Sequence, residues 1–142
     1  MITRGIIVLT LLAAAVGCSS ETPTSSATSA SPTVPVAKDG QNYKACADGV
    51  CEVLIRQKAA LNLNGDKFTA TVLDGALKLT DSKGYISLSK SGSDVSRSGG
   101  GSAGGASGGL AAVSWSEQGG PLHIATLTYA EGDTVLVTFA TQ

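Results

Sequence analysis

The stretch LHIATLTYAEGDTVLVTF, residues 122–139, decides the fold that this sequence favours. Apolar residues recur among threonines over residues 122–129, and a β-branched run follows over residues 134–139. Between them stands Glu131-Gly132-Asp133. Glycine accepts a positive φ and aspartate bonds its own backbone, so this tripeptide is typical of a turn. The stretch therefore predicts an antiparallel β-hairpin.

The same alternation of short apolar runs and turn residues continues upstream. Asn64-Gly65-Asp66 and Asp74-Gly75 are strong hairpin signals. Strands are predicted at residues 51–56, 60–63, 68–73, 76–80, 85–90 and 110–117. No stretch beyond the N-terminal segment has helical periodicity. Seven or eight short strands at near-regular spacing predict an all-β domain, either an antiparallel sandwich or a barrel-like meander.

A glycine- and serine-rich segment, SGSDVSRSGGGSAGGASGG, covers residues 91–109. Glycine loses the most conformational freedom on ordering and offers no side chain to pack, so a loop is predicted here. The spacing Gly99-x-Gly101-x-x-Gly104 formally matches a dinucleotide-binding fingerprint. That fingerprint requires a preceding strand and a following helix, and a string this rich in glycine matches it by chance.

The first eighteen residues, MITRGIIVLTLLAAAVGC, indicate where the protein works. The apolar run over residues 6–16 is too short for a permanent span of ~30 Å and fits a signal peptide over residues 1–17. Ala15-Val16-Gly17-Cys18 resembles a bacterial lipobox, with Ala15 where Leu is commonest. The resemblance implies that Cys18 is linked to diacylglycerol and becomes the mature N-terminus. Two acyl chains suffice for stable attachment, so the expected location is the outer face of the cell membrane.

Residues 18–37 are mostly Ser, Thr, Pro and Ala, a composition that predicts a disordered linker. Residues 38–142 then form a single β-rich extracytoplasmic domain. Ten basic and eleven acidic residues are spread along the chain without a block of like charge. Because phosphate binding needs clustered Lys and Arg, nucleic acid is not an expected partner. The same dispersion argues against a polybasic grip on anionic lipid.

Cys46 and Cys51 remain once Cys18 is assigned to lipid. An even pair in an exported domain predicts a disulfide, with Asp48-Gly49 turning the chain between the two thiols. The pair running into Glu52-Val53, the long β meander and the terminal hairpin resemble small secreted or lipid-anchored proteins of actinobacteria. This resemblance implies a compartment and a fold, and no activity.

No catalytic residue, metal site or cofactor is predicted. His123 is the single histidine, and no serine occupies a G-x-S-x-G elbow. Asn62, Asn64 and Asp66 have the first spacings of a calcium loop, but its glycine and its final glutamate are missing. The aromatic residues Tyr85, Trp115 and Phe139 are expected in the core rather than on a sugar-binding platform.

The predicted function is therefore a membrane-anchored binding or interaction module of unknown ligand, not an enzyme. An envelope protein and a wall polymer are the candidate partners, in addition to the membrane itself. Two alternatives stay open: an envelope hydrolase that uses His123 with a carboxylate, and a carrier of an apolar ligand. A pocket joining His123 to a carboxylate would favour the first, and a dry cavity between the sheets would favour the second.

Overall fold

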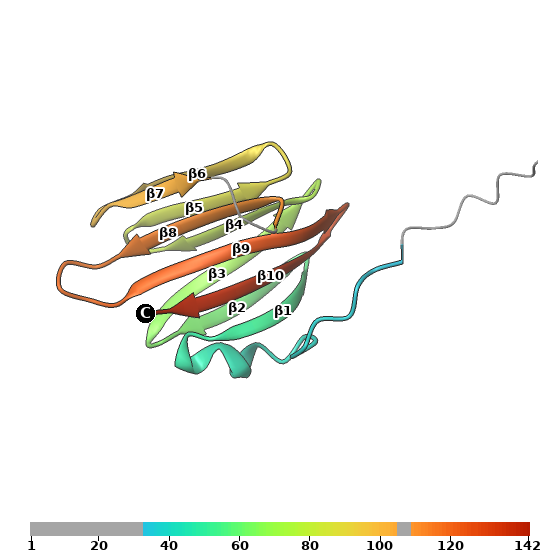
Figure 1. Ribbon diagram of the computed structural model, residues 1–142, viewed down its shortest axis with the longest axis horizontal. Coiled ribbons are helices and arrows are strands. Elements are labelled where there is room, and N and C mark those ends of the chain that lie inside the picture. Colours follow the sequence, from blue (N-terminus) through green and yellow to red (C-terminus); the bar gives the residue numbers. More distant parts are fainter. Residues whose placement is uncertain (1–32, 105–108) are drawn as a thin grey trace, which may run out of the picture. The chain divides into compact units, whose positions relative to one another are not determined.

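The computed structural model describes residues 33–104 and 109–142. The predicted signal peptide, Cys18 and the first part of the predicted linker lie outside these residues. Ten strands and one short 3-10 helix make up the described part (Figure 1). They are η1 (Tyr43–Asp48), β1 (Cys51–Arg56), β2 (Lys58–Leu63), β3 (Asp66–Leu73), β4 (Ala76–Asp81), β5 (Gly84–Ser89), β6 (Gly92–Arg97), β7 (Gly101–Gly104), β8 (Ala111–Ser116), β9 (Leu122–Glu131) and β10 (Thr134–Thr141). No helix in the described ranges is long and apolar enough to cross a membrane.

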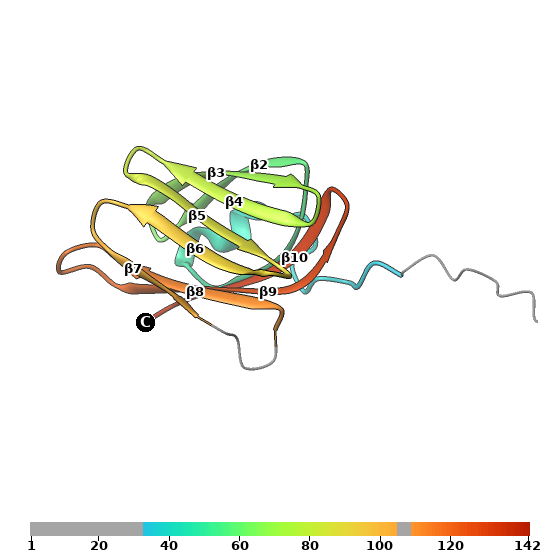
Figure 2. The ribbon, with the colours of Figure 1, turned by 90° about the horizontal axis from the view of Figure 1, so that it is seen from above.

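The strands form two antiparallel five-stranded sheets that face each other as a sandwich and do not close into a barrel (Figure 2). One sheet, which we call sheet A, has the order β1-β10-β9-β8-β7. The other, sheet B, is the meander β2-β3-β4-β5-β6. The predicted all-β fold is confirmed, and the predicted hairpin at residues 122–139 is the β9–β10 pair.

The core lies between the sheets because successive side chains of a strand point to opposite faces. In β3, Phe68, Ala70 and Val72 are buried while Lys67, Thr69 and Thr71 are exposed. The largest fully buried side chains come from both sheets: Trp115, Phe139, Ile55, Leu63, Leu77, Leu79, Ile86, Leu88 and Leu127. These side chains fill the space between the layers.

Two-residue turns fix the register of sheet B. Asn64 and Gly65 have φ values of 53° and 96°, and Asp74 and Gly75 have 50° and 72°. Paired positive φ values match the right-handed twist of the flanking strands. Leu63 therefore pairs with Asp66, and Leu73 with Ala76.

The prediction of a loop over residues 91–109 is wrong for two segments, which form β6 and β7. Ser93 and Val95 of β6 are half-buried, the side chain of Arg97 is buried, and the three alternate with exposed neighbours; Val95 packs against the core. Gly101 of β7 lies so close to this strand that an added Cβ would be 2.6 Å from a methyl group of Val95. These two strands raise the number from the predicted seven or eight to ten.

The segment before β1 covers the free edge of sheet A. The Leu54 amide donates to Gly40 O (2.7 Å), and the Tyr43 hydroxyl donates to Leu54 O (3.1 Å). Ala37, which is predicted to be the last residue of the linker, is buried against Leu54 and Leu136 on the outer face of sheet A. Edge strands with unpaired backbone groups invite pairing with other chains, and this segment protects β1 from it.

Candidate functional site

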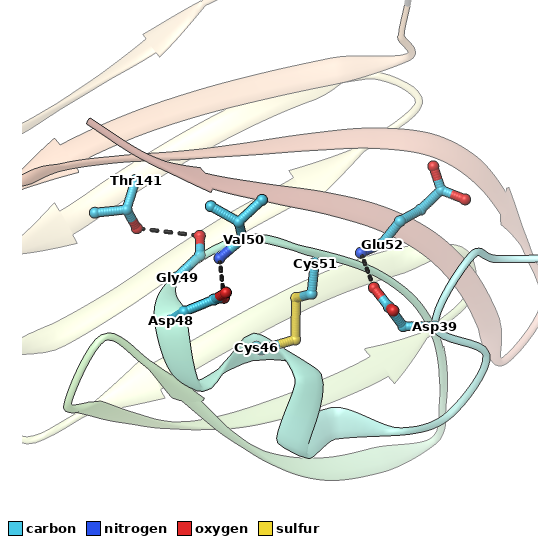
Figure 3. The surroundings of a disulfide bond; sticks show 8 residues. All are labelled: Asp39, Cys46, Asp48, Gly49, Val50, Cys51, Glu52 and Thr141. Carbon is cyan, nitrogen blue, oxygen red and sulfur yellow. Dashed lines mark hydrogen bonds between the residues drawn. A yellow bond between two sulfur atoms is a disulfide. The ribbon is translucent and has the colours of Figure 1, made fainter.

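The disulfide predicted between Cys46 and Cys51 is present, and it ties η1 to the start of β1 (Figure 3). Gly49 ends η1 in the left-handed region, with φ of 83°, and its amide donates to Cys46 O. Asp48 Oδ1 accepts a hydrogen bond from the Val50 amide at 2.9 Å. These contacts hold η1 in one position beside sheet B.

A groove of about 410 Å³ runs between η1 and the outer face of β2 and β3. Tyr43 and Lys44 form its η1 wall, and Lys67 and Thr69 belong to β3. Ala60, Leu61, Asn62 and Phe68 complete the lining. Two ammonium groups and no carboxylate therefore stand around a mostly apolar hollow. Sequence reasoning missed this groove because its walls come from segments that meet only in the folded chain.

His123 lies inside the sandwich, where 2% of it is exposed. Its ring stacks on Trp115 with centroids 5.3 Å apart, and its Nδ1 lies 3.0 Å from Thr141 Oγ1. Its Nε2 lies 3.4 Å from Asp66 Oδ2 and makes no hydrogen bond in the described part of the chain. Burial lowers the pKa of His123, and the nearby Asp66 carboxylate opposes that shift.

Asp66 brings a carboxylate beside the imidazole, as the hydrolase alternative requires, and Thr141 places a hydroxyl at the other ring nitrogen. The Thr141 hydroxyl, however, donates to Gly49 O at 3.1 Å (Figure 3). An added Cβ on Gly49 would lie 2.0 Å from that hydroxyl oxygen, so backbone packs directly against it. Neither His123 nor Thr141 lines the groove beside η1. These contacts link β3, β9, β10 and the turn at Gly49, and they leave little room for a substrate at the Thr141 hydroxyl.

A second polar cluster surrounds Arg97, whose side chain is 1% exposed. Its guanidinium pairs with Asp81 of β4 and with Glu117, which follows β8, so it links the two sheets. It also lies over the Phe68 ring, 5.3 Å from the centroid. Lys83 forms an ion pair with Glu117 at 2.6 Å, and its hydrogen bond lowers the pKa of that carboxyl group.

The remaining candidate residues have structural positions. Trp115 and Phe139 are in the core as expected, whereas Tyr85 is partly exposed and donates a hydrogen bond to Asp94. Asn62 Oδ1 accepts from the Gly65 amide within the hairpin turn. Residues 33–104 and 109–142 contain no group of three or more His, Cys, Asp or Glu side chains placed to hold a metal ion.

No protein-family model matches this sequence, and comparison with curated proteins and with solved structures gives no match.

Proposed function

We propose that the protein is a lipid-anchored extracytoplasmic binding module that acts at the cell envelope. The main support for the binding role is the groove beside η1. Apolar surface and lysine side chains that have no ion-pair partner among the described residues come together in this groove, as apolar and polar groups do in many ligand sites. The disulfide supports the compartment, because such bonds persist in oxidising environments. The lipobox-like residues ending at Cys18 supply the proposed anchor.

The two alternatives have less support. The hydrolase needs a pocket that joins His123 to a carboxylate; the Asp66 carboxylate lies 3.4 Å from His123 Nε2, but His123 is buried and does not line the groove. The apolar-ligand carrier needs space between the sheets, where large side chains such as Trp115 and Phe139 are packed. The binding module needs only the surface that the groove already provides.

Site-specific photo-crosslinking in intact envelopes tests the binding role. A photoreactive residue replaces Thr69 in the groove or, as the control, Thr128, which is exposed on β9 of the opposite sheet. We expect one defined envelope component to be captured from position 69 and not from position 128. Equal capture from both positions, or none from either, would overturn the proposal. Mass spectrometry of the mature N-terminus tests the anchor, which requires a diacylglyceryl group on Cys18.

A further inference from the structure

Four lysines gather on one face of the molecule although they are spread along the sequence. Lys44 belongs to η1, and Lys58, Lys67 and Lys78 belong to β2, β3 and β4. All four are exposed. None of them has an ion-pair partner within the described ranges, whereas Lys83, Lys90 and Arg97 are paired with carboxylates. We call these four lysines and the outer face of β2–β4 the basic face.

The strand register orders this face into rows that run across the strands. Ala60 pairs with Thr69, and Thr69 pairs with Thr80, which gives a row of small uncharged side chains. The next row contains Lys58 and Lys78 with Thr71 between them. Rows are ~6.6 Å apart and strands ~4.8 Å apart, so Lys58 and Lys78 are separated by ~10 Å at their backbones.

The row of small side chains is a track with positive charge on both sides. Lys67 lies one row away on the side of the Asn64-Gly65 turn, and Lys58 and Lys78 lie one row away on the other side. One end of the track enters the groove, which Ala60 and Thr69 line and which Tyr43 and Lys44 bound. The outward positions of β2, β3 and β4 carry no Asp or Glu.

We propose that the basic face binds a linear phosphodiester polymer of the cell envelope, whose backbone follows the track while its phosphates meet the flanking lysines. The proposal rests on the binding role argued above and names its ligand class. Lysine binds phosphate as a point charge. Small side chains leave room for a chain along the track, and the wall formed by η1 favours a narrow polymer over a broad membrane surface.

Two other polyanions fit the face less well. An acidic polypeptide would gain most from pairing with a free strand edge, but the segment before β1 covers the β1 edge and η1 lies beside β2 (Figure 1). Single-stranded nucleic acid needs aromatic side chains on which its bases stack. Two aromatic rings lie near the track. Tyr85 is covered by the Lys78 ammonium at 4.4 Å, and Tyr43 in the groove wall is half-buried and held by the hydrogen bond from its hydroxyl to Leu54 O.

Binding of the full chain to poly(glycerol phosphate), measured by fluorescence anisotropy over a salt series, tests the proposal. A Lys58→Gln/Lys78→Gln variant is compared with a Lys38→Gln/Arg56→Gln variant, which loses the same charge from exposed residues outside the face. At roughly 1 kcal/mol for each lysine near an anionic surface, the first variant should weaken binding about thirtyfold. It should also flatten the salt dependence, since fewer counterions are released. The control should change affinity less than threefold.

A single carboxylate in the track gives a second measurement. Thr69→Glu should reduce affinity at least as much as the double lysine variant, whereas Thr128→Glu on sheet A should not. Equal weakening by both members of either pair would overturn the proposal, because net charge alone would then explain binding. Tighter binding to polyglutamate, to a single-stranded oligonucleotide or to phosphatidylglycerol vesicles would overturn it too. Crosslinking from position 69 to a protein would refute the polymer while leaving the binding role intact.

Discussion

Replacing Gly49 with alanine should destabilise the fold more than the same change at Gly119, although both glycines have similar φ values. Gly49 has φ of 83° and Gly119 has 75°. An added Cβ meets no atom within 4 Å at Gly119, but at Gly49 it would lie 2.0 Å from Thr141 Oγ1 and 2.8 Å from Thr141 Cβ. A new rotamer of Thr141 cannot relieve the second contact, so backbone must move.

The expected magnitudes follow from these contacts. An alanine in the left-handed region destabilises the folded state by ~1–2 kcal/mol. Alanine also reduces the conformational entropy of the unfolded chain, which offsets ~0.4–1 kcal/mol of that loss. The net loss of stability for Gly119→Ala is therefore about 1 kcal/mol. Gly49→Ala adds the loss of the Thr141 hydrogen bonds to Gly49 O and His123 Nδ1. One lost bond costs ~1 kcal/mol and a buried ring nitrogen without a partner costs ~1–3 kcal/mol. The Gly49→Ala variant should therefore be less stable than Gly119→Ala by about 2–4 kcal/mol.

Urea unfolding followed by the emission of the single tryptophan measures the difference, because Trp115 is buried and becomes exposed on unfolding. Thr141→Ala removes the hydroxyl that the new Cβ would meet, so in the Gly49→Ala background it should restore part of the loss. The interaction energy of that double-mutant cycle should exceed ~0.5 kcal/mol. Equal losses for the two glycine variants would refute the reasoning.

Three further predictions concern the polar groups of the fold. Replacing Cys46 and Cys51 with serine removes a disulfide that joins residues five positions apart. Urea unfolding should show a free energy of unfolding lower by about 2 kcal/mol. Burial lowers the pKa of His123, so the unfolded chain binds a proton at a higher pH than the folded chain does. The free energy of unfolding should therefore fall as pH drops from ~6.5 toward the lower pKa of the folded state. A His123→Gln variant should lack this pH dependence in urea unfolding. Arg97→Met leaves the Asp81 carboxylate without its ion-pair partner, while Glu117 keeps Lys83, and should lower the free energy of unfolding by ~3 kcal/mol in thermal unfolding. Lys90→Met at an exposed pair should lower it by under ~1 kcal/mol.

The parts of the fold that depend on neighbouring residues could be predicted from the sequence. Alternating apolar residues indicated β3, β4 and β9 because one face of each strand is buried. The β-branched run indicated β10, whose first four residues are all buried. Asn64-Gly65 and Asp74-Gly75 indicated their hairpins because both residues of each pair adopt positive φ. The Cys46–Cys51 bond followed from the number of thiols available after Cys18 was assigned to lipid.

The parts that depend on distant residues could not be predicted. In β6, Val95 is the single large apolar residue, and the inward position of Arg97 is possible because Asp81 and Glu117 neutralise it. Those partners lie in β4 and after β8, so nothing in the local sequence marks a buried arginine. Asp66 belongs to the Asn64-Gly65-Asp66 turn signal, and a turn alone accounts for an aspartate at this position. Its contact with His123 of the other sheet could therefore not be predicted.

The strand register determines which charged side chains become neighbours on a sheet face. The basic face could not be predicted from the sequence because its lysines become neighbours only through this register. In a hairpin with a two-residue turn, residues equally far from the turn pair directly and share one face, so Thr71 and Lys78 lie side by side across Asp74-Gly75. The same relation across Asn64-Gly65 joins Lys58 to Thr71. Lysines separated by many residues thus meet on one surface, although no window of the sequence contains a cluster. Exchanging Lys78 with Leu77 would leave the local composition unchanged, but it would turn the ammonium into the core and remove it from the face.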